Sequence, residues 1–463
     1  MEKSQLDKNL NFSLGTDNKK VLLALLFLFT GVSIAWAQLN NSSQTLKEKK
    51  SDANLFGRFA NPPAESRPFV RWWWNGNYIT AGELKRQLEV LHKAGLGGIE
   101  INPIALPAQA VIKGAQPIEW LSKDWNHLLA MVAQEAKQKG MITDMIVGSG
   151  WPFGGEFLKK EEMIERIVTH KIVCTGGSKI KENEESLLQK AIADGKIVKG
   201  GKSSNVVNFL ALVPDKVTVR SQIIDLTSRY KKDGQLNFNV PEGKYDLIYG
   251  ILQRGYRTVS LGALGASGPV MNHSDHNVTL AYLNSLKKIS EDTGIPLNEL
   301  IRVLFCDSIE LAGANWTDGL EEIFFKTYHY RLEPYFPFIF YENKKNKVLY
   351  APANFADSFS EEKMRVRYDY NKLLVSLFLD NFTRTFQKFC VENGFKSRYQ
   401  AYGIPLLMGM MEGNMISDIP EGNNWIYSFN MNMETDEWAL NQGLSREPFH
   451  LALNYRGWNP CWN

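Results

Sequence analysis

A repeating pattern of strands and helices begins with the stretch RPFVRWWWNGN at residues 67–77. Its β-branched and aromatic residues predict a strand. The capping box TAGE at 80–83 and leucines at helical spacing after it then predict a helix. A strand at 98–101, a helix at 124–139 and a strand at 141–147 follow. Because strands that alternate with helices across short loops run parallel, the pattern indicates an α/β fold.

The pattern favours a (β/α)8-type TIM barrel over a doubly wound nucleotide-binding sheet. The turn Gly148-Ser149-Gly150 lacks the further glycines and charged residues of a nucleotide-binding loop. The pattern resumes with a strand at 301–305, a long helix at about 361–393 and a strand at 397–402. About five strands are therefore predicted by residue 402, whereas a closed barrel needs eight. We expect a barrel that is incomplete at the C-terminus.

Residues 165–265 interrupt the barrel pattern. Alternating strands separated by turns such as GGKSS at 200–204 predict an all-β insertion, with a single helix at about 184–193. The sequence thus predicts five segments: a signal peptide at 1–37, a mobile leader at 38–55, a first part of the barrel at 56–164, the insertion at 165–265 and a barrel continuation at 266–463.

The N-terminus resembles a secretory signal. Lys19 and Lys20 precede an apolar run at 21–29, and Ala35-Trp36-Ala37 has the small-x-small pattern of a cleavage site. The apolar run is too short for a comfortable membrane span. We therefore expect a secreted or periplasmic bacterial protein whose mature chain starts at Gln38.

The composition narrows the class of ligand. With 53 basic and 50 acidic residues the net charge is +3, which gives no reason to expect nucleic acid as a partner. The hydrophobic fraction of 44% excludes a disordered chain. The chain has 12 Trp, 17 Tyr and 25 Phe, and although most should belong to the core, such rings can also stack on sugars.

Polar and aromatic residues gather where the predicted strands end, which is where a β/α barrel keeps its active site. Carboxylates, amides and indoles at one mouth suit a carbohydrate better than a phosphate. The candidates at these ends are Trp74, Asn75 and Asn77 after the first strand, Glu100 in the second, Trp151 after the third, and Asp307 and Glu310 after the fourth.

Glycoside hydrolysis needs two carboxyl groups across the scissile bond. Glu310 is the first choice for the general acid because it lies just past an apolar strand, where partial burial favours the protonated form. The second carboxylate stays open between Glu412, Asp418 and Glu421. His273, in HSDH at 273–276, is either part of a helix cap or a substrate contact, and a zinc site is not expected there.

The stretch at 67–77, AGLGGIE at 94–100, GSGWPFGG at 148–155, DSIE at 307–310, and QAYG at 400–403 with DIPE at 418–421 occur in this order. Together they resemble glycoside hydrolase family 106, the α-L-rhamnosidases of bacterial polysaccharide degradation. The resemblance implies a β/α barrel, an inverting mechanism with two glutamates, and calcium at the sugar hydroxyls, for which no ligands can be assigned. Glu310 matches the family's Asp-Ser-x-Glu segment. Glu421, or a glutamate beyond Asn463, corresponds to the other, and because family members are longer, this chain is similar to their N-terminal portion.

We therefore predict an exported glycosidase that cleaves terminal α-L-rhamnosyl bonds of a rhamnose-containing glycan. Glu310 would be the acid and Glu421 the base. The alternative is a non-catalytic carbohydrate-binding protein, or an inactive fragment, on a degenerate barrel. The predicted sugar contacts are Trp72, Trp74, Asn75, Asn77, Glu100, Trp151, Asp307 and His273. Since a strand alternates its faces, at least one of the three consecutive tryptophans must be buried elsewhere.

Overall fold

The computed structural model describes residues 55–106, 116–195, 197, 203–340, 358–401 and 410–421. The chain divides into two compact units, residues 1–63 and 64–463. The first contributes the helix α2 (Leu55–Ala60), and the predicted signal peptide lies outside the described residues. All that follows concerns the second unit.

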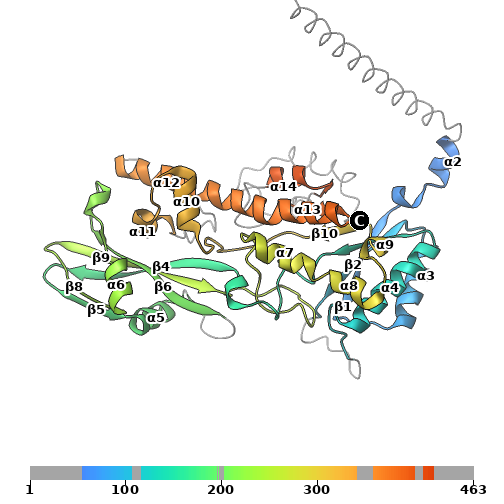
Figure 1. Cartoon of the computed structure of the whole chain (residues 1–463), viewed down its shortest axis with the longest axis horizontal. Coiled ribbons are helices and arrows are strands. Elements are labelled where there is room, and N and C mark those ends of the chain that lie inside the picture. Colours follow the sequence, from blue (N-terminus) through green and yellow to red (C-terminus); the bar gives the residue numbers. More distant parts are fainter. Residues whose placement is uncertain are drawn as a thin grey trace, which may run out of the picture. The chain divides into compact units, whose positions relative to one another are not determined.

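A parallel sheet of six strands carries the candidate site (Figure 1). Its order is β1-β2-β3-β10-β11-β12, and every neighbouring pair is parallel. The strands are β1 (Phe69–Asn75), β2 (Gly98–Ile104), β3 (Ile142–Ile146), β10 (Val303–Cys306), β11 (Lys396–Tyr399) and β12 (Ile419–Pro420). The parallel α/β arrangement confirms the prediction for the regions at 67–147 and 301–402 as far as they are described.

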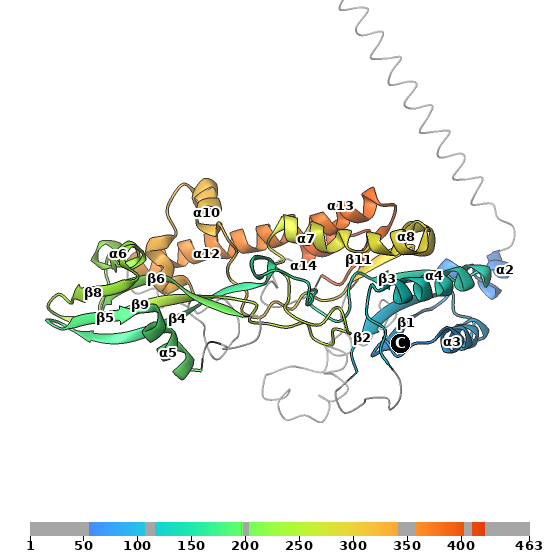
Figure 2. The ribbon, with the colours of Figure 1, turned by 60° about the horizontal axis from the view of Figure 1, so that its bottom comes forward.

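Helices cover one face of this sheet, as Figure 2 shows for α3 and α4 beside β1, β2 and β3. Side chains cap their N-termini: Thr80 accepts from the Glu83 amide, Ser122 from the Trp125 amide, and Asp275 from two amides of α7. The helices of this region are α3 (Ala81–Lys93), α4 (Lys123–Gln138), α7 (His276–Asn284), α8 (Lys287–Thr293), α9 (Leu297–Leu300), α13 (Arg384–Glu392) and α14 (Met410–Ile416).

The described strands form an open sheet. Within the described residues β1 pairs with β2 alone and β12 with β11 alone. A closed ring of eight strands is therefore not formed by this part of the chain.

An antiparallel sheet of order β4-β9-β6-β7 lies within the predicted insertion, next to a two-stranded β5-β8 sheet. The strands of the two sheets are β4 (Glu165–Thr175), β5 (Lys179–Asn183), β6 (Ser204–Pro214), β7 (Ile224–Asp225), β8 (Gln235–Asn239) and β9 (Lys244–Arg254). The helix α5 (Glu184–Ala193) has the predicted bounds, whereas α6 (Thr227–Asp233) was not predicted. Leu187 of α5 and Tyr230 of α6 pack with Leu212 and Leu247 of the sheet in one apolar cluster.

The other face of the antiparallel sheet is also buried. Phe209 and Leu252 pack with residues of α10 (Leu320–Tyr328), α11 (Phe336–Ile339) and α12 (Ser358–Phe378). The sequence analysis counted these helices with the barrel continuation, because chain order does not reveal which sheet a helix covers. Helices therefore pack on both faces of the antiparallel sheet.

The helix α12 continues without a break through a π-helical turn (Leu379–Thr383) into α13. α12 contacts α10 and α11, and α13 contacts α7 and β11. The long helix predicted at 361–393 is thus confirmed where it is described. Short 3-10 turns also occur among the described residues, at Ala64–Ser66, Lys160–Glu162, Arg220–Gln222 and Glu333–Tyr335. Among the described residues, no helix is both long and apolar enough to cross a membrane.

Candidate active site

The first strand presents its aromatic run to two different environments. Trp72 donates from Nε1 to Gln87 of α3 at 2.7 Å, and Trp74 contacts Trp125 of α4 edge-on at 5.5 Å. Trp74 is 1% exposed. The predicted sugar contacts Trp72 and Trp74 therefore lie in the helix-facing core. Because side chains alternate along a strand, the opposite face of β1 carries Arg71 and Trp73.

Arg71 reaches three carboxylates from the centre of β1. Its Nε donates to Glu100 at 2.9 Å and its Nη1 to Asp307 at 3.2 Å, while Nη2 lies 3.8 Å from Glu421. The register places Arg71 directly opposite Glu100 on β2. Arg71 therefore joins β1 to a carboxylate on the neighbouring strand and to two carboxylates that lie much later in the chain.

Arg398 on β11 completes the cluster. It contacts Glu100, lies 3.0 Å from Glu421 and 3.9 Å from Asp144. The Arg398 and Arg71 guanidinium carbons lie 4.6 and 4.5 Å from the ring centroid of Phe305 on β10. A buried aromatic ring thus supports both cations, which are otherwise surrounded by carboxylates.

The cluster carries more negative than positive charge. Arg302 binds Asp144 through two hydrogen bonds of 3.0 and 2.7 Å, so four carboxylates face three guanidinium groups. Burial raises the pKa of the Asp144, Asp307 and Glu421 carboxyls, while neighbouring arginines oppose that rise. In a low-dielectric site with one carboxylate more than its cations, the carboxyl groups keep their protons to a higher pH than they would in water.

The two predicted catalytic glutamates follow β10 and β12, which are parallel strands of the same sheet with β11 between them. Glu421 is buried, its amide donates to the Tyr399 carbonyl, and its Oε1 accepts from Gln400 at 3.3 Å. Glu310 is half-buried on the loop after β10, where Ser308 Oγ donates to its Oε1 at 3.3 Å.

The two other carboxylates that the sequence left open have different surroundings. Asp418 Oδ2 accepts from both the amide and the hydroxyl of Ser397 at 2.8 Å, which joins the last strand to β11. Glu412 is exposed on α14. Glu421 alone of these three contacts the arginine cluster in the described residues.

The remaining predicted sugar contacts separate into two groups. Glu100 and Asp307 belong to the cluster. Trp151 is half-buried on the loop after β3, where its backbone forms an isolated antiparallel bridge with Ser260. Asn75 is exposed at the end of β1, whereas Asn77 is fully buried with a φ of 53°.

His273, the remaining predicted sugar contact, is buried. It is 1% exposed, its Nδ1 donates to the Met271 carbonyl at 2.9 Å, and its ring lies 4.8 Å from that of Phe382. Burial lowers its pKa to about 3, so the imidazole is neutral. The helix cap at this position is Asp275, which agrees with the capping alternative of the sequence analysis.

Sequence reasoning missed Arg71, Arg398 and Gln400. A signal was present, because a charged residue in the middle of a predicted buried strand must face a partner or an interior site. Arg71 stands between Val70 and Trp72, and Arg398 between Ser397 and Tyr399.

The described residues contain no group of three or more His, Cys, Asp or Glu placed as metal ligands. The four clustered carboxylates do not fit calcium, because guanidinium groups already contact each of them. The calcium implied by the resemblance stays a prediction without ligands.

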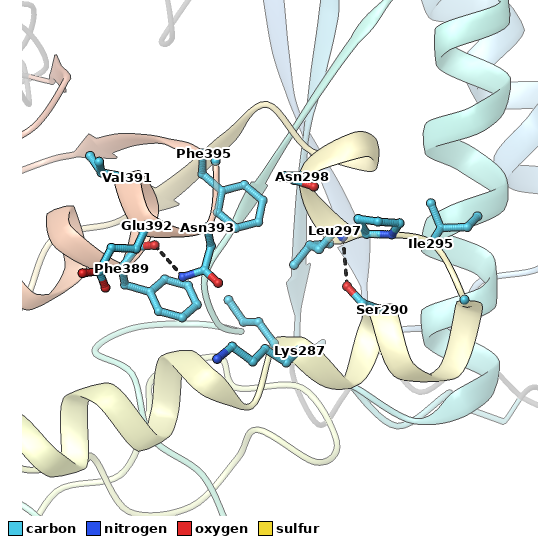
Figure 3. Close-up of a pocket in the computed structure, with 14 residues that line it drawn as sticks. Lys287, Ser290, Ile295, Leu297, Asn298, Phe389, Val391, Glu392, Asn393 and Phe395 are labelled. Carbon is cyan, nitrogen blue, oxygen red and sulfur yellow. Dashed lines mark hydrogen bonds between the residues drawn. The ribbon is translucent and has the colours of Figure 1, made fainter.

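A cavity of about 720 Å3 lies away from this cluster, between α8, α9 and the turn from α13 to β11 (Figure 3). Phe389, Phe395 and Leu297 form its apolar wall, and Lys287 and Glu392 lie among its polar groups. It adjoins the starts of β10 and β11, whereas the candidate residues lie along and beyond those strands. None of the predicted site residues lines it.

The parallel sheet thus gathers buried carboxylates and their arginine partners from β1, β2, β3 and β11, from the residues that flank β10 and from the residue after β12. Paired carboxyl groups are what glycoside hydrolysis requires. The chain's sequence matches the family described as alpha-L-rhamnosidase over residues 60–211 and 210–446. The chain belongs to this family, glycoside hydrolase family 106.

Two further proteins are similar to the chain. A protein of Formosa agariphila named "Putative beta-glucuronidase" is 23% identical over 371 residues, which cover 75% of this chain and 30% of the relative. The structure of a rhamnosidase from Novosphingobium sp. PP1Y has a TM-score of 0.52 and 16% identity, and the match covers 74% of this chain and 47% of that one. The second likeness supports the fold. The chain spans less than half the length of either protein.

Proposed function

We propose that this chain is part of an enzyme that hydrolyses terminal α-L-rhamnosyl bonds with inversion at the anomeric carbon. The observation that carries the proposal is that two glutamates follow parallel strands of one sheet, Glu310 after β10 and Glu421 after β12, with β11 between them. Glu421 is held by Arg71 and Arg398, and Glu310 lies on the more open loop. The match to the family described as alpha-L-rhamnosidase supports rhamnose as the sugar.

Glu421 suits the general base. Burial raises the pKa of its carboxyl, which makes the carboxylate a stronger base, and the two guanidinium groups favour its ionised form. In the reaction Glu421 takes a proton from water as the water oxygen bonds to the anomeric carbon. Glu310 gives its proton to the glycosidic oxygen as the bond between that oxygen and the anomeric carbon breaks. The products are free rhamnose and the remaining glycan.

Trp73 and Trp151 are the rings that we propose for the sugar pocket in place of Trp72 and Trp74. Both are half-buried, and Trp73 shares the strand face of Arg71, whose guanidinium carbon lies 5.5 Å from the indole centroid. A half-buried indole can offer part of its face to a sugar while its other atoms stay packed.

The test uses turnover of two substrates by the 463-residue chain. We expect Glu310→Gln to lower turnover of an unactivated rhamnosyl disaccharide about 10²–10⁴-fold, with a smaller loss on 4-nitrophenyl α-L-rhamnoside, whose leaving group needs little protonation. Glu421→Gln should lower both by similar factors, because each substrate needs the attacking water. Glu412→Gln is the matched control and should leave both rates unchanged, since Glu412 is exposed.

Two other outcomes decide between alternatives. Sugar binding in calorimetry without turnover would favour the non-catalytic carbohydrate-binding protein or inactive fragment. Turnover of 4-nitrophenyl β-glucuronide in place of the rhamnoside would transfer the activity to that suggested by the name of the Formosa agariphila relative.

We also propose that the protein is exported, on the basis of the charged, apolar and small-residue order at 19–37. N-terminal sequencing of the secreted protein should begin at Gln38. A secreted protein that retains the residues before Val21 would contradict this.

A further inference from the structure

A second cavity, of about 690 Å3, lies apart from the arginine cluster. Its walls come from the loop before α4, the loop after β3, a glycine turn, and α7 with α8. The lining residues are Glu119, Trp120, Leu121, Ser122, Lys123, Phe157, Gly265, Asn284, Ser285, Lys288, Glu291 and Asp292. None of them takes part in the ion pairs of the candidate active site.

One wall of this cavity is the outer end of an aromatic stack. The Phe157 ring lies 6.0 Å from that of Tyr282, which lies 6.3 Å from Trp120 and 5.8 Å from Phe153. Tyr282, Trp120 and Phe153 are buried, whereas Phe157 is 50% exposed. An isolated exposed phenylalanine needs no explanation, but this ring is anchored on buried rings and lines a cavity of ligand size.

A close backbone approach forms another wall. Gly265 has a φ of 86°, and a Cβ there would lie 2.6 Å from Glu119 Cγ and 3.0 Å from the Trp120 carbonyl oxygen. The Trp120 amide also donates to the Leu264 carbonyl at 2.8 Å. The turn is therefore fixed against the loop before α4, and a side chain at 265 would push the two apart.

The polar lining holds two lysines and three carboxylates, so it has no excess of positive charge. Glu119, Lys123, Lys288 and Glu291 are exposed, so two cations face two carboxylates. The third carboxylate, Asp292, accepts from Asn126 at 2.7 Å. Such a lining offers donors and acceptors to hydroxyl groups without the excess positive charge that an anionic ligand would require.

We propose that this cavity is a second carbohydrate site, which binds a neutral sugar unit of the glycan away from the bond that is cut. One face of that sugar packs on Phe157, and its hydroxyl groups bond to the charged and amide groups of the rim. The proposal rests on the proposed function for the identity of the glycan. It assigns the cavity to substrate-chain binding rather than to chemistry.

The experiment measures affinity and turnover separately. Wild type and Phe157→Ala are titrated by calorimetry with soluble rhamnan oligosaccharides and with methyl α-L-rhamnoside. We expect Phe157→Ala to weaken oligosaccharide binding roughly 5- to 10-fold, the worth of one aromatic contact. Its turnover of 4-nitrophenyl α-L-rhamnoside should match wild type, and Phe157→Tyr, which keeps the ring, should retain oligosaccharide affinity.

Phe325→Ala is the matched control, since Phe325 is 37% exposed on α10 and lines neither this cavity nor the cluster. It should bind oligosaccharide as wild type does. Unchanged oligosaccharide affinity in Phe157→Ala, an equal loss in Phe325→Ala, or a wild-type chain that binds no rhamnan would overturn the second site. Rhamnan binding that depends on Phe157, in a chain that hydrolyses no rhamnoside, would support the second site and refute the proposed activity.

Discussion

The parallel and antiparallel sheets of this chain differ in what covers their two faces. Both faces of the antiparallel sheet are covered by apolar clusters, with Leu210 and Leu247 on one side and Phe209 and Leu252 on the other. The parallel sheet has one such face, against its helices, and a second face where Arg71 and Arg398 meet carboxylates.

The difference favours the parallel sheet as the place of the proposed chemistry. Buried ion clusters cost desolvation free energy and are weak evidence for stability, whereas apolar packing of similar volume is often as stable or more so. Four buried carboxylates on the parallel sheet, beside an antiparallel sheet packed with leucine and isoleucine, are therefore consistent with the proposed active site.

The largest expected effect is the removal of one cation from the parallel sheet. Arg398→Met removes one of the two cations at Glu100 and leaves Glu421 with Arg71 at 3.8 Å, and we expect a loss of about 3–5 kcal/mol in local stability. Native-state hydrogen exchange of the β10 and β11 amides measures it. Arg384→Met, which removes an exposed pair with Asp380, is the control and should change exchange little. Equal effects from the two variants would remove the contrast between the sheets.

The antiparallel sheet should respond to volume instead. Leu212 is fully buried, so Leu212→Ala should cost about 3 kcal/mol through lost burial and a residual cavity. Relative to wild type at the same pH, the hydrogen-exchange rates of the β6 and β9 amides should rise by the same factor at pH 5 and at pH 8. A loss that changes with pH would show that charge contributes to this core as well.

Glu165, at the start of β4, is a charged group at one end of the antiparallel sheet. It contacts Arg254, which also lies 2.6 Å from Asp318, and burial raises the pKa of Glu165 to about 7. Because the folded state then binds the proton more tightly than the unfolded state, this contribution to stability is complete below about pH 4.5 and is lost as the pH rises through 7.

Glu165→Gln should therefore flatten part of the fall in melting temperature between pH 5 and pH 8. Scanning calorimetry at several pH values measures the difference from wild type. Glu361→Gln serves as the control, since it removes an exposed carboxylate that pairs with Arg365 and leaves Glu165 and Arg254 in place. Parallel wild-type and Glu165→Gln curves would contradict the raised pKa.

The smallest effects concern the helices that cover the sheets. Asn183 caps α5 with an Oδ1 contact of 2.8 Å, and Thr80 caps α3 with a contact of 3.4 Å. Asn183→Ala should cost about 1 kcal/mol and Thr80→Ala less, because the shorter hydrogen bond is the better one. Local exchange of the first turn of each helix compares them. A larger cost at Thr80 would contradict this order.

The sequence predicted the order of elements better than it predicted their faces. Period and turn chemistry placed the strands near 69–75 and 98–104 and the bounds of α5, because these signals are local. They could not choose which of three consecutive tryptophans faces the helices. That choice depends on contacts with Gln87 and Trp125, which lie on helices that follow β1 in the sequence.

The candidate site was predicted only in part for a similar reason. Glu100, Asp307 and Glu421 were recognised as carboxylates near strand ends, but what joins them is Arg71, which lies 236 residues from Asp307. No spacing rule connects positions so far apart, and the pairing follows from the order of strands in the sheet.

The unbroken helix from α12 to α13 has a consequence for how the chain tolerates change in length. Its buried residues recur at intervals of four, and since a turn has 3.6 residues, each step advances the apolar stripe around the helix by about 40°. The stripe starts among side chains of the antiparallel sheet and ends among those of the parallel sheet: Val366, Tyr370, Leu374, Phe378, Phe382, Phe386 and Cys390. Deleting one residue near the π-helical turn would rotate everything beyond it by about 100° and point one half of the stripe away from its core. One continuous helix packs against both cores, so its length and rotation must suit both of them. Insertions or deletions that a loop tolerates should therefore destabilise the protein here.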